Sequence, residues 1–178
     1  FKWICYDMGN SAFILLVATI LPIYFNYLSS SQGVAEHNYL SYWSYAASLS
    51  TLIVALAGPI LGTLADYKDH KKKIFLTCAM LGALALACFW IPTSWFAFLV
   101  LFIAAKVAYS LSLIVYDSML TDITTEERMD AVSSKGYAWG YIASVVPFII
   151  SLVFVLMYDK MGMTLKTAMM IAFILNAV

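Results

Sequence analysis

The residues Gly62-Thr63-Leu64-Ala65-Asp66-Tyr67-Lys68-Asp69-His70-Lys71-Lys72-Lys73 form a short basic segment between two long apolar ones. Four of the ten Lys and Arg residues of the chain lie within six positions of this segment. No Asp, Glu, Lys or Arg occurs in residues 37–65 or 74–105. Two uncharged spans joined by a basic loop are typical of two membrane helices with a cytoplasmic turn between them.

The composition of the whole chain indicates a membrane protein. Of the 178 residues, 63% are hydrophobic and only 11% are charged, whereas soluble domains carry about 25% charged residues. A soluble fold of this composition would expose far too much apolar surface. We therefore expect an all-α membrane protein whose main partner is the lipid bilayer. Nucleic acid is not expected as a partner, because no basic cluster with interleaved aromatic residues lies outside the spans.

The apolar stretches predict six membrane helices. They cover approximately residues 3–28, 39–66, 74–91, 95–117 and 133–158, and a sixth begins near residue 162. The first should be kinked at Pro22, and Thr125 could cap a short surface helix before the fifth. The uncharged run at 167–178 is too short to cross about 30 Å of hydrocarbon. We expect residues 1–178 to form one six-helix domain with a truncated sixth helix.

The distribution of Lys and Arg predicts the orientation of these helices. Under the positive-inside rule, the loops with more Lys and Arg lie in the cytoplasm. The expected inner set is Lys2, Lys68, Lys71, Lys72, Lys73, Arg128 and Lys135. Only Lys160 and Lys166 fall on the outer side. The N-terminus and residues 66–73 are therefore expected in the cytoplasm.

Small residues on two of the expected helices predict close contacts between helices. On the second helix they recur at steps of three and four: Ser41, Ser44, Ser48, Thr51, Ala55, Gly58 and Gly62. On the fifth helix Gly136 and Gly140 form another G-x-x-x-G pair. Small residues let helix backbones approach closely inside a membrane. For the second helix, packing is a better explanation of the pattern than a ligand site.

Lys106 is the most informative single residue. It lies twelve residues after Ser94 and eleven before Asp117, which places it near the bilayer midplane. A central Lys costs roughly 2.5–3.5 kcal/mol on the insertion scale unless it faces protein or water. Two interpretations stay open: a structural ion pair, or a site for a solute carboxylate or for charge coupling. Tyr109 and Asp117 share its helix face.

Further polar residues lie on the first and fifth helices. Asp7 and Asn10 are three positions apart on one face of the first. Asp7 could be a helix cap or interface residue, or it could face a cavity and take part in gating. Tyr137 and Tyr141 give the fifth helix a half-polar face. The candidates for a solute cavity are Asp7, Asn10, Lys106, Tyr109, Asp117, Tyr137 and Tyr141.

The sequence shows no apparatus for covalent chemistry. Cys5, Cys78 and Cys88 form no C-x-x-C pair and are odd in number, so neither a disulfide nor a metal site is expected. Both histidines lie in loops, and no Ser-His or Cys-His arrangement is visible. We expect no cofactor and no metal, and a membrane-embedded enzyme is disfavoured.

The basic segment resembles the signature loop between helices two and three of the major facilitator superfamily of transporters. Residues 3–12 resemble the W-x-x-Y-D-x-x-N-S-A opening of its vacuole effluxer-like branch. Residues 116–123 and 135–141 are similar to its Y-N-x-x-L-P-D-I and G-x-x-W-G-Y segments. The chain departs from these patterns at Asp117 and Thr121, where Asn and Pro are expected, and at Asp69-His70, where Gly-Arg is commoner.

The resemblance implies the N-terminal half of a twelve-helix transporter, built as a three-plus-three inverted repeat, with a further six-helix half as its partner. It implies alternating access, with Gly62, Asp66, Lys68, Lys71 and Lys72 as a cytoplasmic gating loop. Fungal members of the branch release amino acids from the vacuole, so it implies efflux of a small polar solute such as an amino acid, with a proton as a candidate coupling ion.

Two points remain open at this level. The membrane would be the plasma membrane of a bacterium or the vacuolar membrane of a fungus. The alternatives to a secondary transporter are a channel-like protein and a non-transporting membrane scaffold or sensor. Saturable transport coupled to an ion gradient would separate a transporter from both, because a pore does not saturate and a scaffold carries no flux.

Overall fold

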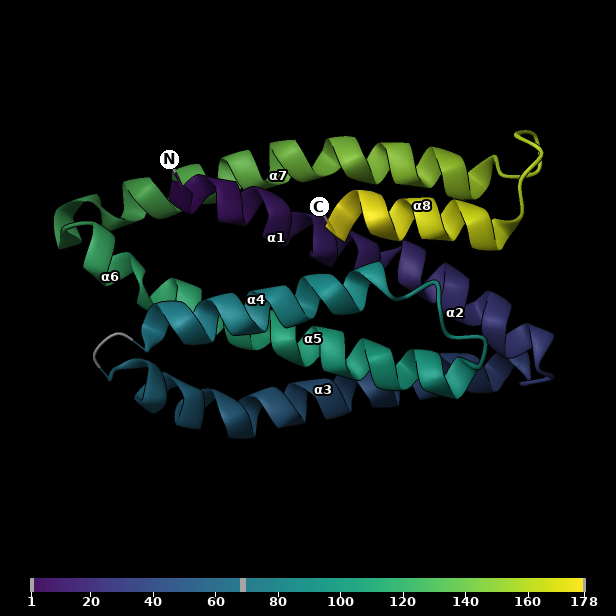
Figure 1. Ribbon diagram of the computed structural model, residues 1–178, viewed down its shortest axis with the longest axis horizontal. Helices are drawn as coiled ribbons and strands as arrows, with labels where there is room; N and C mark the ends of the chain where they lie inside the picture. Colours follow the sequence, from purple (N-terminus) through teal and green to yellow (C-terminus); the bar gives the residue numbers. More distant parts are fainter. Residues whose placement is uncertain (1, 68–69, 178) are drawn as a thin grey trace.

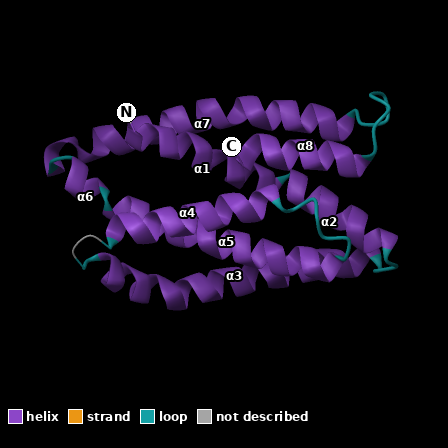
Figure 2. Cartoon of the chain, in the orientation of Figure 1, coloured by secondary structure: helices purple, strands orange, loops and turns teal. Residues whose placement is uncertain are grey.

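The computed structural model of the protein describes residues 2–67 and 70–177. Within these ranges the regular structure is entirely helical (Figures 1 and 2). The helices are α1 (Lys2–Ala18), α2 (Ile20–Ser31), α3 (Glu36–Ala65), α4 (Lys71–Ala87), α5 (Trp95–Ser118), α6 (Leu120–Ile123), α7 (Glu126–Leu156) and α8 (Leu165–Ala177). Lys68, one of the expected gating residues, lies outside the described residues.

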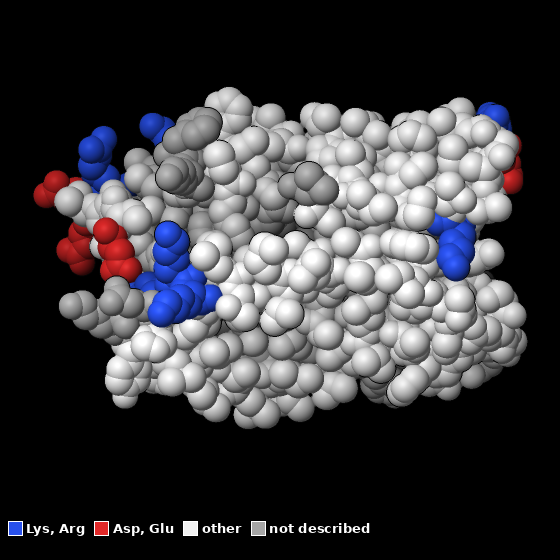
Figure 3. All heavy atoms as spheres, viewed as in Figure 1, with Lys and Arg blue, Asp and Glu red and all other residues white. Residues whose placement is uncertain are grey.

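The long helices run side by side in a bundle (Figure 1). Four segments among the described residues are long and apolar enough to cross a membrane: Cys5–Ser31, His37–Ala65, Trp95–Ile123 and Glu126–Leu156. The space-filling view shows charged side chains gathered at the two ends of the bundle on this face, with an uncharged belt between them (Figure 3). This is the charge distribution that a bilayer requires.

The first span is bent, as its proline predicts, but the break comes before the proline. Helix α1 ends at Ala18 and α2 begins at Ile20, with Thr19 between them at φ −132°. Pro22 has no N–H group to donate to the carbonyl of Ala18, so the regular helix is interrupted one turn earlier. The Thr19 hydroxyl donates to the carbonyl of Leu15 at 2.6 Å.

Two expected boundaries were wrong. No separate surface helix follows Thr125, because α7 runs without a break from Glu126 to Leu156. The last helix does not start near Gly162, which has φ +67° and therefore lies in a turn. Helix α8 begins three residues later, at Leu165. Left-handed backbone is readily adopted by glycine and cannot form part of a right-handed helix.

The bundle core lies near the end opposite the basic loop. Helix α1 packs along α7, α5 lies against both α3 and α4, and α8 contacts α7 and α4. Aromatic rings from α2, α5 and α8 and from the segment just after α4 meet between them. The fully buried rings are Tyr24, Phe25, Phe89, Phe98, Phe102 and Phe173. Ring pairs of this kind stabilise a fold beyond their buried area.

The helices differ in how much of their surface the bundle covers. In the most apolar stretch of each span, 44% of the residues are buried for α1–α2 and 39% for α5. The corresponding values are 11% for α3 and 22% for α7. Helices α3 and α7 therefore present long apolar faces to lipid or to other protein.

Candidate functional site

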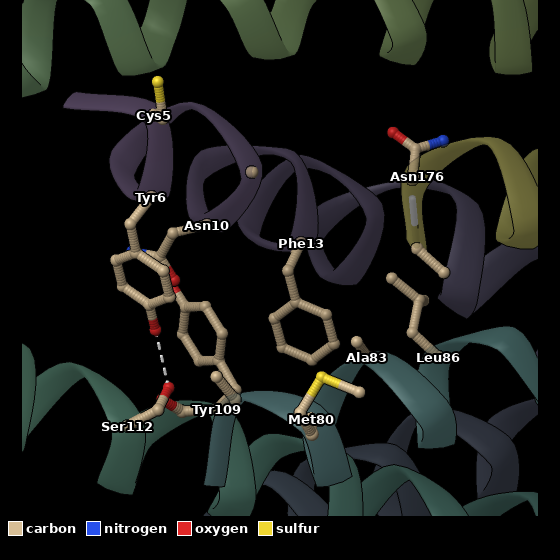
Figure 4. A pocket seen from close by; sticks show the side chains of 14 residues that line it. Cys5, Tyr6, Asn10, Phe13, Met80, Ala83, Leu86, Tyr109, Ser112 and Asn176 are labelled. Atoms are coloured by element: carbon tan, nitrogen blue, oxygen red, sulfur yellow. Dashed lines mark hydrogen bonds between the residues drawn. The ribbon is translucent and has the colours of Figure 1, made fainter. Parts of the chain in front are cut away.

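A cavity of ≈ 270 Å³ lies between α1, α4, α5 and α8 (Figure 4). Its polar wall comes mainly from α1 and α5, and its apolar wall from α4. The lining residues from these helices include Tyr6, Asn10, Phe13, Met80, Tyr109 and Ser112. Helix α8 contributes Asn176 and Ala177. Two of the seven residues predicted from the sequence, Asn10 and Tyr109, line this cavity.

A hydrogen-bond chain joins α1 to α5 at the polar wall. The hydroxyls of Tyr6 and Ser112 are 2.7 Å apart (Figure 4). Ser112 donates its single hydrogen to the carbonyl of Tyr109 at 2.7 Å. Tyr6 must therefore be the donor to Ser112. Tyr6 and Ser112 were not predicted as site residues, although Tyr6 lies in the segment at 3–12 that resembles the family.

Asn10 and Tyr109 point toward one another across the cavity (Figure 4). The Tyr109 ring packs on Phe13, with ring centroids 4.5 Å apart. The Asn10 Oδ1 atom and the Tyr109 hydroxyl are both buried, and neither has a hydrogen-bond partner of good geometry among the described residues. Buried polar atoms normally have such partners, so the hydrogen-bonding capacity of these two side chains is not fully used.

Asn176 extends the polar contacts to α7. Its Nδ2 atom donates to the Ser151 hydroxyl at 2.7 Å and to the Ala172 carbonyl at 2.8 Å. Ser151 in turn donates to the carbonyl of Pro147 at 2.8 Å. The Asn176 Oδ1 atom is buried without a partner among the described residues. Asn176 was not predicted as a site residue, although a single Asn in an apolar run of the sequence could have indicated it.

Asp7 does not line the cavity but lies at the contact between α1 and α7. A Cβ atom at Gly136 would collide with the Asp7 carboxylate, so this side chain occupies the space that the glycine leaves. The Trp3 ring nitrogen also lies 3.6 Å from the position of that Cβ atom. Tyr116 donates to the Trp3 carbonyl at 2.9 Å, and its ring stacks on the Trp3 ring with centroids 3.6 Å apart. The half-buried Asp7 side chain thus lies against a glycine, near this pair of aromatic rings.

Lys106 faces α3. Its Nζ atom donates to the carbonyl of Ala47 at 3.3 Å and lies 6.0 Å from the centroid of the Phe102 ring. Among the described residues the ion pair found is that between Lys71 and Asp122, so Lys106 forms no ion pair there. The ammonium group has three donors and therefore retains capacity for another acceptor.

The remaining candidates are on the surface of the described chain. Asp117 is exposed and lies about three helical turns from Lys106 on the same face of α5. Tyr137 and Tyr141 are 66% and 57% exposed, one turn apart on α7. Asn10 and Tyr109 are therefore the two members of the predicted set that line this cavity.

Lys71 of the basic segment, the first residue of α4, contacts the end of α5 and the short helix α6. Lys71 Nζ lies 2.8 Å from Asp122 Oδ2 and 3.3 Å from the Ser118 carbonyl oxygen, to which it donates. Asp66 caps the end of α3, and Lys72 is exposed. Asp122 was not predicted as a partner of this loop, although it lies in the segment at 116–123 that resembles the family.

Apolar helices of membrane-spanning length, polar side chains held between them and, on the face in Figure 3, charge gathered at the bundle ends define the class: an integral, multi-pass membrane protein. A family model described as "Vacuole effluxer Atg22 like" matches residues 1–178, and the chain belongs to this family. This confirms the resemblance seen in the sequence.

A curated relative of this chain is described as a transporter. The chain is 33% identical over 181 aligned positions to the "Uncharacterized MFS-type transporter YxiO" of Bacillus subtilis (strain 168). The match covers 99% of this chain and 42% of the relative. The chain thus spans less than half the length of the relative that it matches. No solved structure was found to match the chain.

Proposed function

We propose that these residues form the N-terminal six-helix half of a secondary transporter that exports a small polar solute, such as an amino acid, by alternating access. Membership of the effluxer family supports the transport activity. The relative described as a major facilitator type transporter supports it further. A coupling proton and a second six-helix half complete the proposal, and no covalent step is involved.

The packing of the helices supports a three-plus-three inverted repeat. We assign α1–α2, α3 and α4 to one unit and α5, α7 and α8 to the other. The first helix of each unit then packs on the second helix of the opposite unit, as α1 on α7 and α5 on α3. Such a reciprocal exchange is expected when two copies of one unit are related by a pseudo-two-fold axis.

The proposal of a solute site rests mainly on the position of Lys106. It is a cation within a membrane span that donates a hydrogen bond to one backbone carbonyl, and no carboxylate of the described residues pairs with it. An ammonium in such a place is expected to bind an anionic group of a solute or to carry a coupling charge. Asp117, Tyr137 and Tyr141 are exposed and can also face the solute pathway.

The other candidates suit supporting roles. Asp7 lies against α7, while Asn10 and Tyr109 lie between α1 and α5. We assign them to the positioning of α1 during the conformational cycle. The basic loop would act as the cytoplasmic gate, with the Lys71–Asp122 pair breaking in one state and forming in the other. In this proposal the N-terminus and residues 66–73 face the cytoplasm.

The test is solute flux in proteoliposomes of the full-length protein, screened over amino acids with and without a proton gradient. If Lys106 binds the solute carboxylate, Lys106→Ala should lower saturable flux at least tenfold, which corresponds to about 1.4 kcal/mol or more of lost interaction. The matched control is Lys160→Ala, which removes an exposed cation from the loop between α7 and α8.

Each other outcome has a distinct meaning. Unchanged flux in Lys106→Ala, with normal amounts in the membrane, would remove Lys106 from the solute site. Flux that never saturates would favour a channel-like protein. No flux of any amino acid would remove the amino-acid assignment and leave the family membership standing.

A further inference from the structure

The carbonyl of Ala47, on the side of α3 that faces α5, receives more donors than it can serve. Lys106 of α5 donates to it at 3.3 Å, and the Thr51 hydroxyl donates to it at 3.0 Å. Because Ala47 lies inside α3, the Thr51 N–H group is the regular helical donor to the same oxygen. A carbonyl oxygen has two lone pairs. The helical bond takes one, so the ammonium and the hydroxyl compete for the other.

Both side-chain donors have capacity for another acceptor. The Lys106 ammonium carries three N–H groups, and the Ala47 carbonyl is its hydrogen-bond acceptor among the described residues. The Thr51 hydroxyl hydrogen can turn to a new acceptor without a movement of the side chain. An anion beside these two groups would receive one hydrogen bond from each, while the carbonyl would keep its helical bond. Hydrogen bonds to an ionised acceptor are also stronger than those to a carbonyl.

The exposed surface of α3 has two different faces. Leu49, Leu52 and Leu56 are 47%, 56% and 67% exposed and share one face at steps of three and four. Thr51 and Ser48 are exposed on the neighbouring face, toward Lys106. Leucines suit contact with lipid, whereas an ammonium in contact with hydrocarbon is costly. The hydroxyl face is therefore the better candidate for a water-accessible pathway.

We propose that Thr51 and Lys106 together bind a carboxylate, with the hydroxyl and the ammonium each donating to one of its two oxygens. One cation and one neutral donor balance a single negative charge, so a carboxylate fits better than a phosphate dianion. The Phe102 ring lies 6.0 Å from Lys106 Nζ and stacks on the Trp43 ring with centroids 4.2 Å apart. These rings give the site an apolar side. This inference rests on the proposed function, because it adds a residue to the solute site of Lys106.

The first test measures the charge at the site without transport. In the full-length protein, with its own cysteines replaced by Ser, Thr51→Cys is reacted with sulfonatoethyl and with trimethylammonioethyl methanethiosulfonate, two thiol reagents of opposite charge. The control is Thr63→Cys, an exposed position about three turns further along α3. The nearby ammonium should raise the preference for the anionic reagent about tenfold over this control. Lys106→Gln should remove the preference, and sodium butyrate should slow the anionic reaction more than butyramide.

Three results would overturn the proposal. If neither reagent modifies Thr51→Cys, this face of α3 is covered and no solute reaches it. If the preference equals that of Thr63→Cys or survives Lys106→Gln, the ammonium does not act at this position. If butyrate protects no better than butyramide, the site does not bind a carboxylate.

A second measurement applies if the cysteine variants do not insert. It is the flux, in proteoliposomes, of the labelled amino acid with the largest saturable flux in the screen described above. Thr51→Val removes the hydroxyl and keeps the shape of the side chain, so the half-saturating concentration should rise about tenfold. Thr51→Ser should restore it. Thr63→Val is the matched control, because the Thr63 hydroxyl donates to the Ile60 carbonyl.

The two measurements separate the failure of this inference from that of the proposed function. An unchanged half-saturating concentration in Thr51→Val would remove Thr51 from the solute site and leave transport standing. If the unmodified protein carries no amino acid, the proposed amino-acid transport fails. The reagent preference and its response to butyrate then still decide whether Thr51 and Lys106 bind a carboxylate.

Discussion

Two G-x-x-x-G motifs in this chain are used in different ways. On α7, Gly136 and Gly140 are both buried and lie directly against α1. On α3, Gly58 is buried beside Ile114 of α5, but a Cβ atom at Gly62 would meet no atom within 4 Å. Most of the small-residue face of α3 is likewise exposed, from Ser41 to Ala55.

The difference shows that a small-residue motif permits close packing without selecting its partner. Both motifs predict a close contact from spacing alone. Only the α7 motif faces a helix whose side chains are shaped to fit it, with Asp7 and Ser11 filling the spaces above the two glycines. The free face of α3 is available to lipid or to protein beyond these residues.

The largest effect is expected from Gly140→Ala. Its Cβ would lie 2.7 Å from the Ser11 hydroxyl and 3.0 Å from the Asp7 carbonyl oxygen, and a backbone atom cannot move without shifting α1. We expect a loss of about 2–3 kcal/mol in the free energy of unfolding, in the upper range for overpacking. Denaturant unfolding of the full-length protein in mixed micelles measures it. Adding Ser11→Gly should recover only part of the loss, and full recovery would show that the backbone contact is unimportant.

Gly136→Ala should cost less. Its Cβ would collide with the Asp7 carboxylate, which is a side chain that can rotate away. A loss of about 1–2 kcal/mol is expected by the same measurement. The double variant with Asp7→Ala should be close to Asp7→Ala alone, since the obstacle is then absent. If Gly136→Ala is equally destabilising in both backgrounds, the loss does not come from Asp7.

Gly62→Ala should be stabilising. No described atom lies close to the position of the new methyl group, and replacing a helical glycine by alanine gains about 0.5–1 kcal/mol. The same unfolding measurement gives the sign. A loss of stability in the full-length protein would show that another part of the protein packs on Gly62, and the contrast between the two motifs would then disappear.

Gly58→Ala should change stability least. Its Cβ would approach the Ile114 Cδ1 atom at 3.0 Å, which is the end of a flexible side chain. The cost of moving that methyl group and the helix-propensity gain are each about 1 kcal/mol or less and oppose each other. Ile114→Val should make Gly58→Ala clearly favourable. If it does not, the constraint at Gly58 lies in the backbone of α5.

Much of the architecture could be predicted from the sequence. The uncharged runs and the basic loop predicted the helices, because a bilayer excludes charge from its interior over a fixed length. The family could be recognised from four short segments, and the family model confirms it. The continuous α7 was not predicted, because the polar residues at 126–132 look like a loop in a hydropathy pattern. The left-handed Gly162 was not predicted either, because a hydropathy pattern does not show the conformation of a single glycine.

The candidate site was less predictable. Helical spacing placed Asp7 and Asn10 on neighbouring positions of one helix face. A rotation of that helix by a few tens of degrees decides whether such a side chain contacts another helix or lines a cavity. Asp7 meets α7, and Asn10 meets Tyr109. Tyr6, Ser112 and Asn176 could not be selected, because a hydroxyl or amide in a membrane helix gains a role only from its partner on another helix.

The sequence by itself determined the class of this protein, its helical segments, its candidate cation at Lys106 and its family, because hydropathy, charge and short motifs are local properties of the chain. The tertiary structure alone decided which glycine pair carries a close helix contact and which polar residues meet. It also decided that Lys106 bonds to the Ala47 carbonyl and Lys71 to Asp122. These depend on how each helix is rotated and which helix lies beside it, and no local pattern specifies either.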